Sequence, residues 1–246
     1  MPDSGPLVTA LAYAWLGGLT IPLGAWLAGR PQLFPRWLDG ELRHTLLAFG
    51  AGALLAAVTL VLIPEGARFI PLWQQLLALS LGGVTFLLLE KHLPRTGLGL
   101  PLLLAMLLDF IPESMALGAL LPQHAEAGLL LAVLIALQNL PEGFNAQREL
   151  QRLPAVAAHR HALLGLFAVL SLLGPLCAWL GMRYLHSSPM LLGWLMLFSA
   201  GGILYLMFQD IAPKIPLRQH WGPPLGTLAG YMLGWAGQHL LHGVGA

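Results

Sequence analysis

Charged residues are scarce in this chain: Asp, Glu, Lys and Arg make up 9% of its 246 residues, whereas an average soluble domain has about 25%. So few charges cannot cover a surface that faces water. The single cysteine, Cys177, excludes a disulfide framework and a cysteine-based zinc cluster. With only 12 Lys and Arg residues and a net charge of +1, the chain also lacks the basic surface that nucleic-acid binding requires.

Hydrophobic residues are abundant instead, at 57% of the chain. They gather in stretches of about 20 residues, the length that a helix needs to cross a bilayer. The sequence therefore predicts an all-α, polytopic membrane helical bundle, with residues 1–246 as a single transmembrane domain. We expect the first stretch to be a retained helix and not a cleaved signal, because it is long and lacks a basic leader. The eight predicted spans are Leu7–Ala28, Leu46–Phe69, Leu72–Glu90, Leu98–Leu121, Ala127–Leu150, Ala162–Leu185, Pro189–Ile211 and Pro223–Leu241.

The basic residues predict the orientation of these spans. Ten Lys and Arg residues lie in the connections after the first, third, fifth and seventh spans, and only Arg68 and Arg183 lie on the opposite side. Loops rich in Lys and Arg remain in the cytoplasm. We therefore expect eight transmembrane helices with both termini outside.

Several acidic residues fall within predicted spans, where an ionised carboxylate is costly. Asp109 and Glu113 lie in the fourth span, and Gln138 and Glu142 lie in the fifth. Residues four apart share one face of a helix, so each pair points in one direction. No Lys or Arg lies in the middle of a span, which leaves a proton, a water-filled cavity or a bound cation as the counter-charge.

A proline precedes each glutamate, in DFIPES (109–114) and QNLPEG (138–143). Proline removes an amide donor and frees a carbonyl one turn earlier, which a membrane tolerates only beside protein or a wet cavity. Two such helices would offer three carboxylates and an amide oxygen, a ligand set that suits hard divalent cations. A protonated structural glutamate is the alternative for any single position. The predicted metal ligands are Asp109, Glu113, Gln138 and Glu142.

A polar stripe continues from these ligands along the fifth span. Gln138, Glu142, Asn145 and Glu149 follow helical spacing, which indicates an inward release path. An amphipathic helix end entering water would explain Glu149 but neither Gln138 nor Glu142. His159 and His161 could collect metal at the exit, although solvated loop residues are the simpler interpretation. The residues assigned to a pathway are Asn139, Asn145, Glu149, Asp210, Gln209 and Glu65.

These motifs resemble the ZIP (Zrt/Irt-like protein) family of divalent metal transporters, in a divergent bacterial-type form. The two proline motifs resemble its metal-binding helices; GAGALLAAVTLVLIPEG (50–66), GPLCAWLG (174–181) and GGILYLMFQDIAP (201–213) add support. The resemblance implies the same four ligands and a homodimer. This sequence departs from the family's pattern at Asp109, where the family usually has a histidine, and at Gly174, where it has a glutamate. Phe110 and Asn139 replace further ligands, and Val61 and Gln209 replace histidines. A second metal position is therefore not expected, and a site without imidazole favours iron(II) or manganese over zinc.

The expected function is transport of Zn²⁺ or a related cation (Fe²⁺, Mn²⁺ or Cd²⁺) across a membrane into the cytoplasm. The metal is the substrate, and no organic cofactor is expected. The expected partners are the divalent ion and the lipid bilayer, with no nucleic acid, and the location is a cell membrane of the bacterial inner-membrane type. A metal-binding receptor or non-transporting relative is one alternative. An intramembrane metal-dependent enzyme is another, but the chain has no HExxH motif, no Ser–Lys pair and no arginine cluster for phosphate, so we expect no enzyme.

Overall fold

The fold is entirely helical across the residues that the computed structural model describes, which are 4–30, 38–92, 100–153, 160–215 and 221–243. No strand occurs in these ranges, so the predicted all-α class is confirmed. The α-helices are α1 (Ser4–Ala28), α2 (Leu38–Ala56), α3 (Ile63–Ala67), α4 (Leu72–His92), α5 (Leu100–Leu120), α6 (Ala125–Leu150), α7 (Arg160–Ser171), α8 (Leu173–Leu180), α9 (Pro189–Leu206) and α10 (Gly222–Gly243).

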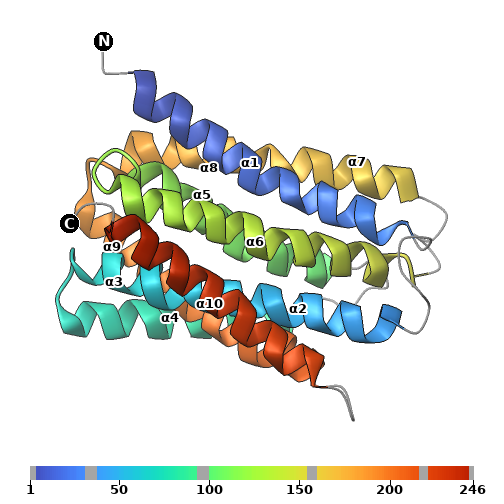
Figure 1. The fold of residues 1–246 in the computed structure, drawn as a ribbon. Helices are drawn as coiled ribbons and strands as arrows, with labels where there is room; N and C mark the ends of the chain where they lie inside the picture. Colours follow the sequence, from blue (N-terminus) through green and yellow to red (C-terminus); the bar gives the residue numbers. More distant parts are fainter. Residues whose placement is uncertain (1–3, 31–37, 93–99, 154–159, 216–220, 244–246) are drawn as a thin grey trace.

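Short irregular turns join some of these helices into longer rods. The π-helical turn Ala57–Leu62 links α2 to α3, and another, Gly181–Leu185, extends α8. After α9 come a third, Met207–Ile211, and a 3₁₀ turn, Ala212–Lys214. The π-helical turns widen a helix locally and are frequent at functional sites. The rods run roughly along one axis, and the start of α1 and the end of α10 lie at the same end of the bundle (Figure 1).

Six helical segments in the described ranges are long and apolar enough to cross a membrane: Gly5–Ala28, Glu41–Ala67, Leu72–His92, Ala125–Leu150, His161–Leu185 and Pro189–Lys214. They coincide with six of the predicted spans. Helices α5 and α10 lie where the other two were predicted but are not among these six. The start of the second span was placed too late, since α2 begins at Leu38 and not at Leu46. Its first turns are polar, so hydropathy alone does not detect them.

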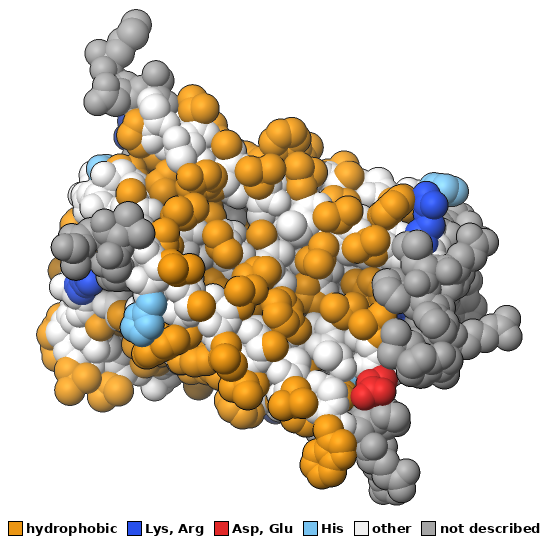
Figure 2. Space-filling model, viewed as in Figure 1, with side chains coloured by type: hydrophobic (Ala, Val, Ile, Leu, Met, Phe, Trp, Pro, Cys, Tyr) orange, Lys and Arg blue, Asp and Glu red, His pale blue; other side chains and the backbone are white. Residues whose placement is uncertain are grey.

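The surface of the bundle is apolar along its length. Figure 2 shows hydrophobic side chains spread over most of this face, with the charged side chains near its two ends. On α4, Leu76, Leu77, Leu81 and Val84 are exposed, and only 17% of its most apolar stretch is buried. Water would not favour such a surface, whereas lipid chains would cover it. Composition, length and surface therefore agree on a membrane protein.

Glycines set the distance between several helix pairs. A Cβ atom added to Gly24 of α1 would run into the backbone oxygen of Leu140 in α6, and one added to Gly143 of α6 would run into that of Ile21 in α1. At these two glycines the backbones of α1 and α6 therefore approach each other closely. Helices α2 and α10 meet in the same way. Small residues permit this close packing in membranes, where the hydrophobic effect does not drive helices together.

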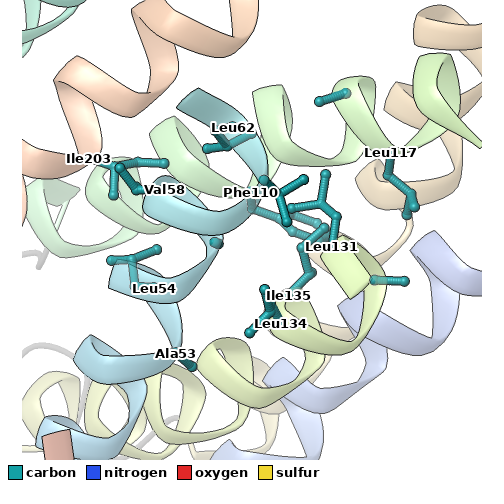
Figure 3. Close-up of a cluster of buried hydrophobic side chains, with 14 of the residues drawn as sticks. Ala53, Leu54, Val58, Leu62, Phe110, Leu117, Leu131, Leu134, Ile135 and Ile203 are labelled. Atoms are coloured by element: carbon teal, nitrogen blue, oxygen red, sulfur yellow. The ribbon is translucent and has the colours of Figure 1, made fainter. Parts of the chain in front are cut away.

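A cluster of buried hydrophobic side chains lies between the helices of the bundle (Figure 3). It combines Leu117 and Phe110 of α5 with Leu131, Leu134 and Ile135 of α6. Residues of α2, of the π-helical turn that follows it and of α9 complete the cluster, namely Ala53, Leu54, Val58, Leu62 and Ile203. Because Leu117 follows Glu113 by one turn and Leu134 precedes Gln138 by one turn, apolar packing continues from these polar residues toward the α5–α6 connection.

Candidate cation site between α5 and α6

The four predicted ligands lie on two helices that pack against each other. Asp109 and Glu113 are on α5, whereas Gln138 and Glu142 are on α6. Pro112 and Pro141 lie inside these helices as the sequence predicts. At Glu113 and Gln138 the exposed fraction is 0%, and at Asp109 it is 6%. Polar side chains are thus held in the interior of an apolar bundle.

One hydrogen bond joins the two helices at this point. The Nε2 of Gln138 donates to Oε2 of Glu113 at 2.6 Å. Three buried oxygens have no hydrogen-bond partner among the described residues: Oε1 of Glu113, Oε1 of Gln138 and Oε2 of Glu142. Unsatisfied buried acceptors are rare in proteins and each needs a partner such as water or an ion. Acceptor oxygens from both helices are therefore available to a cation.

The carboxyl groups at this site are also close enough to interact electrostatically. The charge of Asp109 acts on the carboxyl group of Glu113, and the charges of Asp109 and Glu113 both act on the carboxyl group of Glu142. Oδ1 of Asp109 accepts a hydrogen bond from the backbone amide of Phe110 at 2.8 Å. Like charges in a poorly hydrated interior repel each other, so either protons or a cation must compensate them.

A cavity of about 70 Å³ opens beside this cluster. Asp109, Glu142, Asn145 and Glu149 all contribute to its walls, so the polar stripe of α6 follows one continuous space from Glu142 onward, while Gln138 lies outside this lining. A water molecule needs roughly 10–15 Å³, and this cavity therefore accommodates several. A wider cavity of about 500 Å³ shares Arg43, Leu47, Glu149 and Lys214 with it. Together they lead from the buried carboxylates to the end of the bundle that bears most basic residues.

Two cationic side chains reach the smaller cavity, which the sequence analysis missed. Arg43 and Lys214 line it together with Asp109 and Glu142. Arg43 belongs to α2 and not to a preceding loop, and its Nε donates to Oδ1 of Asn145 at 3.2 Å. The expectation that a proton, water or bound cation must supply the counter-charge was therefore incomplete. The polar residues before Leu46 are the signal that could have revealed a longer helix.

Other residues assigned to a pathway lie elsewhere. Asn139 is buried against α1, where its Nδ2 donates to the backbone oxygen of Gly17 at 3.1 Å. Gln209 is exposed and its Nε2 donates to Glu90 at 3.2 Å. Glu90 also accepts a 2.6 Å hydrogen bond from Tyr205, so it joins α4 to the rod of α9.

Glu65 lies near the opposite end of the bundle. It forms an ion pair with Arg68 at 2.8 Å and lines a separate cavity with His124 and Glu126. The backbone of Asp210 belongs to the π-helical turn after α9, but its side chain is outside the described part of the structure, and so is His159. His161 is exposed on α7.

The predicted ligands do not form a ready-made metal cluster. Over the described ranges, no group of three or more His, Cys, Asp or Glu side chains is arranged to hold a metal ion. The hydrogen bond between Glu113 and Gln138 occupies one oxygen that a cation would need. Binding by all four residues therefore requires side-chain rearrangement.

Comparison with models of known protein families finds no match, and comparison with curated proteins likewise finds none. The similarity to divalent metal transporters thus rests on the motifs alone and stays a prediction.

Proposed function

We propose that this chain is a divalent-metal transporter related to the ZIP family, which moves Zn²⁺, Fe²⁺, Mn²⁺ or Cd²⁺ across a membrane into the cytoplasm. The observation that carries this proposal is the set of buried acceptor oxygens on α5 and α6 that have no partner among the described residues. An all-oxygen set suits hard cations, and an adjoining cavity gives the ion a way out.

The proposed arrangement in the membrane has eight crossings, with α5 and α10 added to the six long apolar helices. Basic residues such as Arg30, Arg148 and Arg152 lie at the end toward which the cavities open, which is the proposed cytoplasmic end. Both termini would then face outside, and the membrane would be a bacterial inner membrane. A homodimer is part of the proposal through the family resemblance.

Packing among the helices suggests how access could alternate. Helices α1, α5, α6, α7 and α8 form one group, which carries the four ligands, and α2, α3, α4, α9 and α10 form the other; the groups meet mainly where α2 packs against α6 and α9 against α5. Movement of one group against the other around a fixed site is a common transport mechanism. In the present state the cavity opens toward the basic end, and aliphatic packing around Leu117 and Leu134 closes the opposite side.

The direct test is metal flux into proteoliposomes that contain the purified protein. Zn²⁺, Fe²⁺, Mn²⁺ and Cd²⁺ are compared in competition with a dye inside the vesicles. Glu113→Ala and Glu142→Ala should each abolish flux, because each removes an acceptor oxygen and a negative charge from the site. Glu90→Gln is the matched control, since this carboxyl bonds Tyr205 and Gln209 away from the cavity.

The result separates the proposal from its alternatives. Full flux by both alanine variants would contradict the site. Metal binding by the wild-type protein without any flux would indicate a receptor or a non-transporting relative. Comparable loss in Glu90→Gln would show that flux responds to general damage to the bundle.

A further inference from the structure

A positive charge lines the cavity that leads from the carboxyl groups of Asp109 and Glu142. Arg43 on α2 lines the cavity that also contains Asp109 and Glu142, and its Nε donates to Oδ1 of Asn145. Asn145 is fixed from its other side, because its Nδ2 donates to the backbone oxygen of Pro141 at 2.8 Å. The amide oxygen of Asn145 therefore points to the guanidinium.

This hydrogen bond also connects the two helix groups. Arg43 belongs to α2, whereas Asn145 lies on α6 three residues after Glu142. A cation that leaves Glu142 toward Glu149 must pass the Asn145 level, since all three residues line the same cavity. A guanidinium stays protonated at any physiological pH, so it opposes a divalent cation at this level throughout.

We propose that Arg43 is the inner gate of this path: its guanidinium lines the exit, held by Asn145 and attracted by the carboxylates of the cavity. It lowers the affinity for cations that approach from the basic end and yields when an ion leaves from the carboxylates. This proposal rests on the proposed transport function and extends it. It gives Arg43, which is not one of the four predicted ligands, a role in selecting ions by their charge.

The gate is tested by the charge preference of the cavity, which requires no transport. Cys177 is replaced by alanine, and Leu47→Cys supplies a single thiol in the wall that the two cavities share. Its reaction rates with a trimethylammonium and a sulfonate methanethiosulfonate are measured from the basic end. A change in the intrinsic reactivity of the thiol affects both rates alike, so it cancels in their ratio. Arg43→Gln should raise the cation-to-anion ratio ~3-fold or more, because it removes a nearby positive charge.

Two further variants control for trivial effects. Arg43→Lys keeps the charge and should keep the ratio, whereas Arg152→Gln removes a charge from the wider cavity only and should change the ratio less than ~2-fold. An unchanged ratio in Arg43→Gln, an equally unreactive thiol in both proteins, or an equal effect of Arg152→Gln would overturn the gate. If Arg43→Gln does not fold, Arg43→Met, which also removes the charge, takes its place in the same comparison.

Failure of the gate and failure of the transport function are distinguishable. In proteoliposomes with Zn²⁺ at the basic end, Arg43→Gln should lower the half-saturating concentration by ~3-fold. If wild-type protein carries no metal while the reagent ratio still shifts, transport is contradicted and the charged gate stands. If metal is carried but the ratio does not shift, the gate is contradicted and transport stands.

Discussion

At the scale of single residues, the structure contains buried carboxyl and amide groups whose acceptor oxygens lack hydrogen-bond partners among the described residues. Glu113 exposes none of its surface; its Oε2 accepts a hydrogen bond from Gln138, whereas its Oε1 has no partner among the described residues. Such an oxygen can be satisfied by a proton or by a cation, but not by both. Protons and metal ions should therefore compete for the same atoms.

This competition predicts how metal binding depends on pH. Carboxylate ligands must lose their protons before they bind metal, so the affinity for Mn²⁺ should fall as the pH is lowered. Glu142→Gln should weaken binding and also reduce the number of protons released by about one. Titration calorimetry in buffers of different ionisation enthalpy measures both quantities. Binding that is independent of pH in the wild-type protein would contradict carboxylate ligation.

That the members of each pair share one helix face could be predicted from the sequence alone, because this relation is local; that these residues bind metal stays a prediction. Asp109 and Glu113 share a face by helical spacing, as do Gln138 and Glu142. The contribution of Arg43 was missed because it depends on how α2 packs against α6. The partners of Asn139 on α1 and of Gln209 on α4 were not predicted for the same reason, since both are distant in the sequence.

At the scale of helices, close backbone contacts at glycines determine how α1 and α6 fit together. Gly143 lies one residue after Glu142, so this contact also sets the position of the site. The predicted spans located nearly every helix, since apolar length is a strong signal. Their irregular turns and the early start of α2 were not predicted, because neither feature changes average hydropathy.

Gly143→Ala should destabilise the bundle by about 1–3 kcal/mol, because its methyl group would meet the backbone of Ile21 and force the two helices apart. Thermal unfolding in detergent at one fixed scan rate measures the effect. Gly165→Ala on α7 is the matched control, since nothing lies within 4 Å of the added carbon, and alanine favours a helix by up to about 1 kcal/mol. Equal melting temperatures for the two variants would refute the importance of the close contact.

At the scale of the whole molecule, the bundle has one end with most of its basic residues and an apolar surface between the two ends. The cavities open toward the basic end, and Glu65 with Arg68 marks the other. Orientation in the membrane therefore decides the direction in which the proposed path leads. The sequence predicts this orientation from charge alone.

Labelling of single cysteines in the Cys177→Ala background tests the orientation. Arg152→Cys and Gln123→Cys replace exposed residues at the basic end and at the opposite end. An impermeant thiol reagent should label position 123 in intact cells and position 152 only after the membrane is opened. The reverse pattern would make the proposed transport direction wrong while leaving the site intact.

The central claim is that α5 and α6 together hold a divalent cation, and anomalous diffraction from crystals soaked in Mn²⁺ or Zn²⁺ tests it most directly. The account predicts a peak between Glu113 and Glu142, with oxygen ligands at about 2.0–2.2 Å for zinc. A peak only at the distant cavity of Glu65, His124 and Glu126, or no peak beside Glu113 at saturating metal, would contradict it.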